Sequence, residues 1–166
     1  MIFRCSKIAL VAAAGLFALL VGWNNIADYG ANFAFVQHVL AMDTVFEGNP
    51  LVASRAVTSE TLHHAAYWLI IAAELATGLL CLGGAIAMGL AADDTARTFH
   101  RSKRLAVAGL TLGFLTWFTG FMTIGAEWFL MWQSETWNGQ QAAFRFIVCL
   151  GLVLVYLVME DRELEA

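Results

Sequence analysis

The sequence predicts an all-α membrane protein with four transmembrane helices and a partly helical outer (periplasmic) loop between the first and second spans. Of its 166 residues, 60% are hydrophobic and only 13% are charged, whereas soluble domains carry about 25% charged residues. The apolar residues gather in four long segments, and those of the loop repeat at helical spacing. The length suits one domain, 1–166, without a separate soluble enzyme domain.

The first and last predicted spans, 8–25 and 142–159, are the shortest. A helix rises about 1.5 Å per residue, so it needs about 20 residues, and at least about 17, to cross a hydrocarbon core roughly 30 Å thick. Their apolar runs, Ile8 to Trp23 and Phe146 to Met159, are shorter than this. They reach the required length if Lys7 and Arg145 extend their charges toward the membrane surface, or if flanking uncharged residues such as Asn24 and Ala142 join the helices. The first also resembles a signal-peptide core after Arg4, but no small-x-small cleavage site follows it, so we expect a retained anchor.

The second and third predicted spans, 62–92 and 105–132, are longer than a membrane requires. Thr58 or Ser59 can cap the helix that opens the second span. Glu60 then lies in its first turn, where a carboxylate interacts favourably with the helix dipole.

Small residues recur at four-residue spacing in two of the spans. Such positions let helices approach closely, so that dispersion forces hold them together within the membrane. We expect packing seams at Ala14, Ala18 and Gly22 in the first span, and at Gly109 and Gly113 in the third.

The outer cap, 28–61, contains the only proline, Pro50, and is too long and too apolar to be a bare connection. In its first half, two sets of apolar residues repeat at helical spacing, which predicts a short helix lying against the membrane face. Asn49 can cap a second helical turn that has Pro50 at its first position. The two apolar sets are Phe33, Val36 and Leu40, and Phe35, Val39, Met42 and Phe46.

The distribution of basic residues predicts the orientation, because cytoplasmic loops carry an excess of lysine and arginine. Seven basic residues lie on the side that holds both termini, and two lie on or near the other side. We therefore expect both termini in the cytoplasm, and we interpret the basic loop 93–104 as a topology signal rather than a nucleic-acid site. The seven are Arg4, Lys7, Arg97, Arg101, Lys103, Arg104 and Arg162, and the two are Arg55 and Arg145.

Glu74 lies near the middle of the second predicted span, roughly 20 Å deep if about 13 residues of helix precede it. An intramembrane carboxyl is a candidate proton or cation relay, or a hydrogen-bond donor when protonated. Its structural interpretation is a hydrogen bond to a threonine of the third span. Candidate partners share one face of that span with Glu127, namely Thr116, Thr119 and Thr123.

Glu127 and Arg145 lie nine residues before and nine residues after Thr136. A hairpin of two antiparallel helices that turns there brings both to the same depth, so we predict an ion pair at the outer edge of the hydrocarbon. The pair is either a structural contact beneath a tryptophan lid or the centre of a charged pocket under the cap. The lid would include Trp132 and Trp137, and the pocket would add Asp28 or His64.

Histidine and methionine gather at the expected outer face, but they indicate a metal site only weakly. His38 and Met42 lie one turn apart, and His63 or His64 could face them, a combination that suits a soft metal or a haem edge. A haem-binding bundle holds its irons with histidines deep in opposing spans, whereas these lie at a membrane edge. We therefore assign no metal or cofactor and interpret them as hydrogen-bonded structural residues.

Three longer stretches resemble a known family: "ADYGANFAFVQHVLAMDT", "LHHAAYWLIIAAE" and "EWFLMWQSETWNGQQAAFRF". They are similar to the uncharacterised bacterial family of predicted small integral membrane proteins, domain of unknown function 2165, over nearly the whole chain. The resemblance implies a four-span protein of the bacterial inner membrane. It implies no activity and no catalytic residues.

Two functions remain open. The chain has no phosphate-binding loop, nucleophile with an adjacent base, paired thiols or cofactor fingerprint. That absence favours a non-catalytic accessory, assembly or interaction component, in contact with lipid and with a protein partner or further copies of itself. The alternative is a ligand-handling protein, a quinone-, metal- or small-molecule-linked enzyme or transporter. It would use Glu74 and an outer-face pocket drawn from Glu127, Arg145, Asp28, His64, His38, Trp132 and Trp137.

Overall fold

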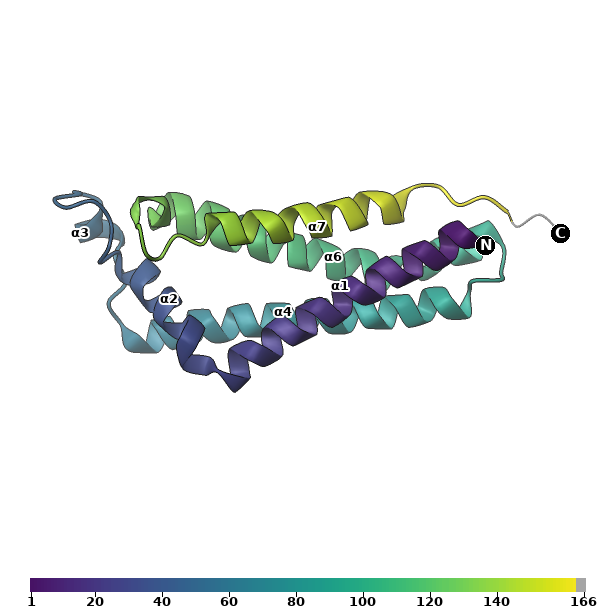
Figure 1. Cartoon of the computed structure of the whole chain (residues 1–166), viewed down its shortest axis with the longest axis horizontal. Helices are drawn as coiled ribbons and strands as arrows, with labels where there is room; N and C mark the ends of the chain where they lie inside the picture. The colour runs from purple at the N-terminus through teal and green to yellow at the C-terminus, as the bar shows by residue number, and fades with distance from the viewer. Residues whose placement is uncertain (164–166) are drawn as a thin grey trace.

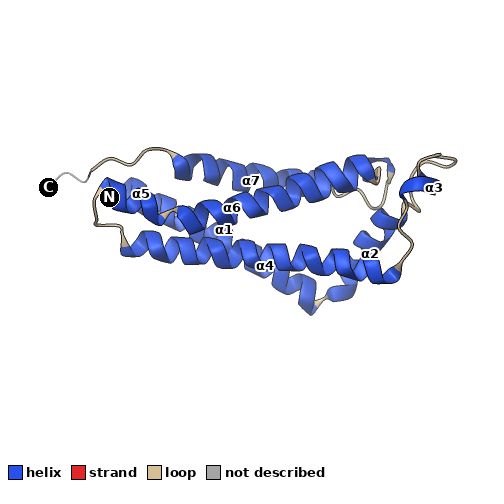
Figure 2. Ribbon diagram, turned by 180° about the vertical axis from the view of Figure 1, so that it is seen from behind, coloured by secondary structure: helices blue, strands red, loops and turns tan. Residues whose placement is uncertain are grey.

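The computed structural model describes residues 1–163 of the chain, and most of them are helical. Four long helical segments run side by side (Figures 1 and 2), and each is long and apolar enough to cross a membrane. No strand occurs within 1–163, so the predicted all-α class with four spans is confirmed. The segments are α1 (Ile2–Ala27), α4 (Glu60–Leu90), a run made of α5 (Ala96–Ser102), α6 (Arg104–Leu115) and η1 (Thr116–Trp128), and α7 (Gln140–Val158).

The segment between α1 and α4 carries two more helices, α2 (Tyr29–Ala41) and α3 (Val52–Arg55), which confirms the partly helical loop. With the short turn η2 (Met131–Gln133) they form the cap end of the bundle, whereas α5 and the N-terminus lie at the opposite end (Figure 2). The helix expected to start at Pro50 begins later, at Val52. The Asn49 side-chain oxygen accepts a hydrogen bond from the Leu51 amide at 3.0 Å, which is the expected capping contact, but residues 50 and 51 form a turn before the helix.

The helix ends differ from the predicted limits at every span, and two of the differences affect how the helices begin and end. α1 begins at Ile2, so Arg4 and Lys7 belong to the helix and do not merely precede it. The third helical run ends at Trp128, before the predicted limit of 132. Leu130 adopts a positive φ of 56° there, a left-handed conformation that an α-helix of L-residues does not continue through.

Glycines allow the helices of the bundle to approach closely. A Cβ added at Gly22 of α1 would lie 2.8 Å from Leu75 Cδ2 of α4, and one at Gly109 of α6 would lie 2.9 Å from the Cys81 backbone nitrogen of α4. Ala18 of α1 is also buried. The two expected seams therefore exist, and both join α4 to its neighbours within the chain.

Two small apolar clusters attach the cap to the bundle. Val36 of α2 packs with Tyr67 and Ile71 of α4, and Val39 of α2 packs with Met131 of η2. Helix α2 thus bridges α4 and the connection between η1 and α7. The side chains that α2 carries consequently have a fixed position relative to the interior of the bundle.

Candidate functional site

The Glu74 side chain is buried in the middle of α4, with 3% of its surface exposed. Its Oε2 atom accepts a hydrogen bond of 2.7 Å from Nδ2 of Asn25 on α1, which is also buried. The structural interpretation that Glu74 bonds a threonine of the third span is therefore wrong. The reason is the close approach of α1, because the absent Cβ of Gly22 would lie only 3.4 Å from the Glu74 Cβ.

A chain of polar groups connects Glu74 to the cap. Asn32 of α2 donates from Nδ2 to Asn25 Oδ1 at 2.7 Å, and the Tyr67 hydroxyl donates to the Asn25 backbone carbonyl at 3.2 Å. Asn25 therefore makes three hydrogen bonds at once, through its side-chain NH2 group, its side-chain oxygen and its backbone carbonyl. Asn32 is exposed whereas Glu74 is buried, so this polar chain, Asn32–Asn25–Glu74, leads from the surface of the cap into the bundle.

A small cavity adjoins the Glu74 carboxyl. Its volume of about 10 Å³ is close to the minimum that one water molecule requires. Thr77 and Thr116 also line it. The Thr116 hydroxyl donates to the Leu112 carbonyl at 2.8 Å, but the Thr77 hydroxyl is buried without any hydrogen-bond partner. The cavity therefore combines a carboxyl with a free hydroxyl in an otherwise apolar interior.

Aromatic rings close the side of this cavity. Phe17 of α1 and Trp117 of η1 both line it. Phe146 of α7 joins them, with ring centroids 5.1 Å from Phe17 and 4.1 Å from Trp117. These aromatic rings come from three helical segments, and Phe17 and Phe146 also line a groove between α1 and α7.

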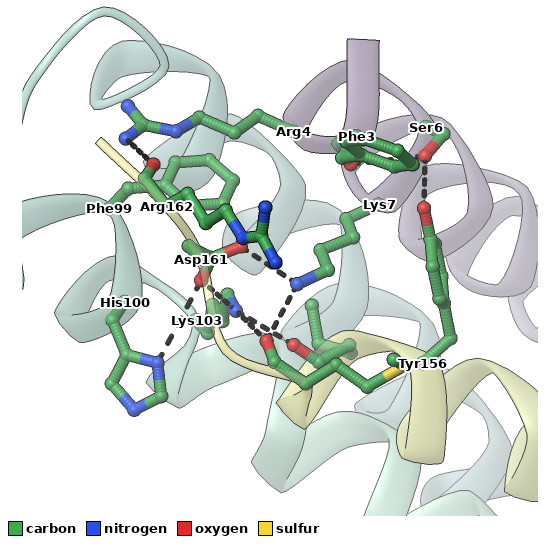
Figure 3. Close-up of polar contacts among 12 residues, drawn as sticks. Phe3, Arg4, Ser6, Lys7, Phe99, His100, Lys103, Tyr156, Asp161 and Arg162 are labelled. Carbon is green, nitrogen blue, oxygen red and sulfur yellow. Dashed lines mark hydrogen bonds and ion pairs between the residues drawn. The ribbon is translucent and has the colours of Figure 1, made fainter. Parts of the chain in front are cut away.

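A second group of buried charges lies at the end of the bundle opposite the cap (Figure 3). Lys7 Nζ is 2.7 Å from Asp161 Oδ1, and Lys103 Nζ is paired with Asp161 Oδ2. All three side chains are 3% exposed. Arg4, also buried, donates to the carbonyl of Arg162 at 3.1 Å. We call Arg4, Lys7, Lys103 and Asp161 the ion cluster, and it ties the segment after α7 to α1 and to the start of α6.

The ion cluster contains three cations and one carboxylate, and backbone carbonyls balance the excess. Lys7 and Lys103 donate to the Met159 carbonyl just after α7, at 2.7 and 3.3 Å, and Arg4 donates to the Ala92 carbonyl just after α4 at 2.9 Å. Helix C-termini carry partial negative charge, so they stabilise these cations. Burial alone would raise the pKa of Asp161, but the hydrogen bonds and charges of Lys103 and Lys7 hold it below its ordinary value.

The predicted ion pair between Glu127 and Arg145 is absent from the part of the chain that the structure describes. Both side chains are exposed, and neither takes part in any of its salt bridges. The reason lies in η1, a π-helix, whose i→i+5 hydrogen bonds rotate successive side chains less than those of an α-helix. The face expected to point inward is turned outward, so that Thr119 and Thr123 are exposed as well.

Arg55 of α3 binds the end of η1 instead. Its guanidinium donates to the Trp128 carbonyl at 3.0 Å and lies 4.5 Å from the centre of the Trp128 ring. Trp132 is 45% exposed and meets Phe46 edge-on, so it covers no buried ion pair. Arg55 of the cap therefore binds a backbone carbonyl at the end of η1, near the place where Arg145 was expected to pair with Glu127.

The candidate residues of the outer face fall into separate groups. His38 Nδ1 is 2.7 Å from Asp43 Oδ2, and the His38 ring stacks on Trp137 at 4.7 Å. His64 Nδ1 is 2.7 Å from the Tyr29 hydroxyl. Asp28, between α1 and α2, is exposed, whereas Met42 is buried.

The geometry gives the histidines no shared metal-binding arrangement. Within residues 1–163, no group of three or more histidine, cysteine, aspartate or glutamate side chains is arranged to hold a metal ion. His63, the other expected neighbour of His38, binds the Val57 carbonyl at 2.7 Å through Nε2. His38 and His64 each have a separate partner, Asp43 and Tyr29.

Several residues of the polar chain and the ion cluster were not singled out as site residues from the sequence. Asn25 and Asn32 lie on two different helices, because the break at Asp28 separates α1 from α2, so no helical spacing in the sequence predicts their contact. Thr77 follows Glu74 by three residues of α4, a spacing that places both on one helix face. Asp161, an acidic residue directly after the last span, gives no comparable pattern.

Four apolar helices around a buried carboxyl, with an ion cluster at one end, define an integral membrane protein with a helical bundle. The sequence profile of a family described as a predicted small integral membrane protein, domain of unknown function 2165, matches residues 3–160. The chain belongs to this family. Neither the curated proteins nor the solved structures contain a significant match.

Proposed function

We propose that the protein is a ligand-handling membrane protein that binds a proton or a small monovalent cation at Glu74. One observation carries the proposal: the Glu74 carboxyl and the partnerless, buried Thr77 hydroxyl line the same water-sized cavity. A polar group without a partner inside a membrane protein is costly, and an intramembrane carboxyl is a functional candidate by default. A cation, or a proton together with one water, would satisfy both groups.

The size of the cavity restricts the ligand class. Pockets for organic ligands measure roughly 300–1,000 Å³, whereas this cavity measures about 10 Å³. A quinone head group therefore does not fit beside Glu74. The oxygen-bearing side chains among the lining residues, Glu74, Thr77 and Thr116, suit a hard cation or a water molecule.

Asn25 controls the state of the carboxyl. Its amide donates to Glu74 Oε2 at 2.7 Å, and an amide N–H donates a hydrogen bond but releases no proton at neutral pH. The polar chain thus orients the carboxyl without relaying protons itself. Exchange of the ligand with the cap side would accompany a movement of Asn25 away from Glu74.

Thermal unfolding of the purified protein in lipid nanodiscs tests the proposal. If the ligand is a cation, sodium or lithium chloride raises the unfolding temperature relative to choline chloride at equal ionic strength. If it is a proton, the temperature depends on pH, and infrared spectra contain a carboxyl band of Glu74. Either response should vanish in Glu74→Gln and persist in the control Glu127→Gln, which alters an exposed carboxylate. Equal responses of wild type and Glu74→Gln would refute the proposal.

An accessory or interaction role is the second candidate, and a different observation favours it. Thr119, Thr123 and Glu127 are exposed along η1, and polar side chains in a span are stabilised when another membrane helix covers them. The glycine seams serve packing within the chain, so this polar face is the better candidate for contact with a partner or a second copy. Native mass spectrometry in mild detergent tests it: Thr119→Leu with Thr123→Leu should dissociate any bound partner or second copy, whereas a monomer in every preparation contradicts it.

We further propose that the ion-cluster end faces the cytoplasm of a bacterial inner membrane. The seven-to-two distribution of basic residues supports this orientation. A reporter enzyme that is active only in the cytoplasm, fused to the C-terminus, should be active. Activity only of a reporter that requires export would overturn the orientation.

A further inference from the structure

A groove lies between the start of α6 and the end of α7, beside the ion cluster. Its volume is about 620 Å³, so it is far larger than the cavity at Glu74 and open to the surroundings. It has a basic rim and an apolar floor. The residues that line it are His100, Arg101, Lys103, Arg104, Val107 and Val158.

The rim has positive charge available for a ligand. Arg101 and Arg104 are exposed, and the side chains of both lack a hydrogen-bond or ion-pair partner within the described part of the chain. Lys103 is paired with Asp161, and His100 Nδ1 is 3.8 Å from the same carboxylate (Figure 3). The ion cluster therefore fixes the inner wall of the groove and leaves the two arginines free.

Carboxylates lie outside this groove. Glu160 and Asp161 line a neighbouring groove together with Arg97, His100 and Arg101, and Asp161 is held there by the two lysines of the ion cluster. None of the six residues that line the groove itself is acidic. The groove is therefore complementary to an anion.

The floor of the groove distinguishes an anionic lipid from a soluble anion. Val107 lies one turn into α6 from Arg104, and Val158 is the last residue of α7. Both arginines lie in the first part of the third candidate span, Ala96–Trp128, beside the last residue of the fourth. We therefore place them at the level of the lipid head groups, with Val107 one turn closer to the hydrocarbon. A soluble phosphate would contact only the arginines, whereas a phospholipid would contact the arginines and the valines.

We propose that this groove binds the phosphate group of an anionic glycerophospholipid, with Arg101 and Arg104 on the phosphate and an acyl chain against Val107 and Val158. Guanidinium groups bind phosphate oxygens through paired hydrogen bonds, and basic pockets between helices at the membrane surface recognise anionic head groups. The site is separate from the Glu74 cavity. The proposal of lipid binding does not depend on the proposed cation binding at Glu74.

Lipid binding by the full chain in detergent, titrated by native mass spectrometry, tests the proposal. Phosphatidylglycerol should bind one per chain more tightly than phosphatidylcholine. Replacing Arg101→Gln and Arg104→Gln together should weaken it roughly 30-fold, from the contribution of two basic residues. The control pair Arg97→Gln and Arg145→Gln removes the same charge from exposed positions and should leave the affinity within about twofold, since neither residue lines the groove.

Two further measurements complete the test. Val107→Trp, which fills the floor and changes no charge, should also weaken phosphatidylglycerol binding while far-UV circular dichroism stays unchanged. Free glycerol 3-phosphate should not compete at equal concentration, because it lacks the acyl chains. Equal binding of the two lipids, equal loss in the control pair, or full competition by glycerol 3-phosphate would each overturn the proposal.

Discussion

Asp161 is the only carboxylate of the ion cluster, and two buried lysines share it. Removing one partner of a buried ion pair leaves the other charge uncompensated, which destabilises a protein by about 3–5 kcal/mol. We therefore expect Asp161→Asn to lower the unfolding temperature strongly at pH 7. The control Glu160→Gln alters a neighbouring exposed carboxylate and should have little effect in the same thermal scan.

The pH dependence of this loss follows from the lowered pKa of Asp161. Because the pKa is lower in the folded protein than its ordinary value of 3.8, the carboxylate contributes stability at every pH above about 4 and loses it as the pH falls through the folded value. The difference in unfolding temperature between wild type and Asp161→Asn should be constant from about pH 5 to 8 and shrink below about pH 4. If the difference in unfolding temperature between wild type and Asp161→Asn grew on acidification, the lowered pKa of Asp161 would be contradicted.

At the scale of the helices, the sequence predicted which segments are helical better than it predicted which way their side chains point. The four spans follow from hydropathy and length, since a bilayer demands about 20 apolar residues of helix. The outward turn of Glu127 could not be read from the sequence. The expected face assumed α-helical rotation, whereas Thr116–Trp128 is a π-helix. The predicted hydrogen-bond partner of Glu74 was also wrong. Gly22 allows α1 to approach α4 closely, which brings Asn25 within hydrogen-bonding distance of the Glu74 carboxyl.

Helix α4 offers a matched pair of glycines that tests the packing seam. A Cβ at Gly84 would lie 2.7 Å from the Ala106 Cα of α6, whereas a Cβ at Gly89 meets no atom within 4 Å. Gly84→Ala should therefore force the backbones of α4 and α6 apart and destabilise the bundle by about 1–3 kcal/mol. Gly89→Ala should be neutral or slightly stabilising, because alanine has the higher helix propensity. Equal unfolding temperatures for the two variants would contradict the close packing of α4 against α6 at Gly84.

The whole molecule has two polar centres in an apolar bundle. The carboxyl of Glu74 and the ion cluster both connect α1 to other helices, but they are far apart. Ala92, which accepts from Arg4, follows Glu74 by 18 residues, or roughly 27 Å of helix. The Glu74 centre was partly predictable, since an intramembrane carboxyl is conspicuous in a sequence. The ion cluster was not, because its basic residues match the pattern of an ordinary topology signal.

This separation predicts which substitutions couple. Asn25→Leu leaves Glu74 Oε2 without its donor and should cost about 1–2 kcal/mol, the value of a polar contact between membrane helices. Adding Glu74→Leu removes the stranded acceptor, so the double variant should be more stable than the sum of the two single losses. Asn25→Leu with Asp161→Asn should instead be additive within about 0.5 kcal/mol, because distant sites with no shared partner do not interact. Reversible unfolding in mixed micelles measures the free energies of unfolding of the wild type, the three single variants and the two double variants. Strong coupling between Asn25 and Asp161 would show that the two centres form one network, contrary to their separation along α4.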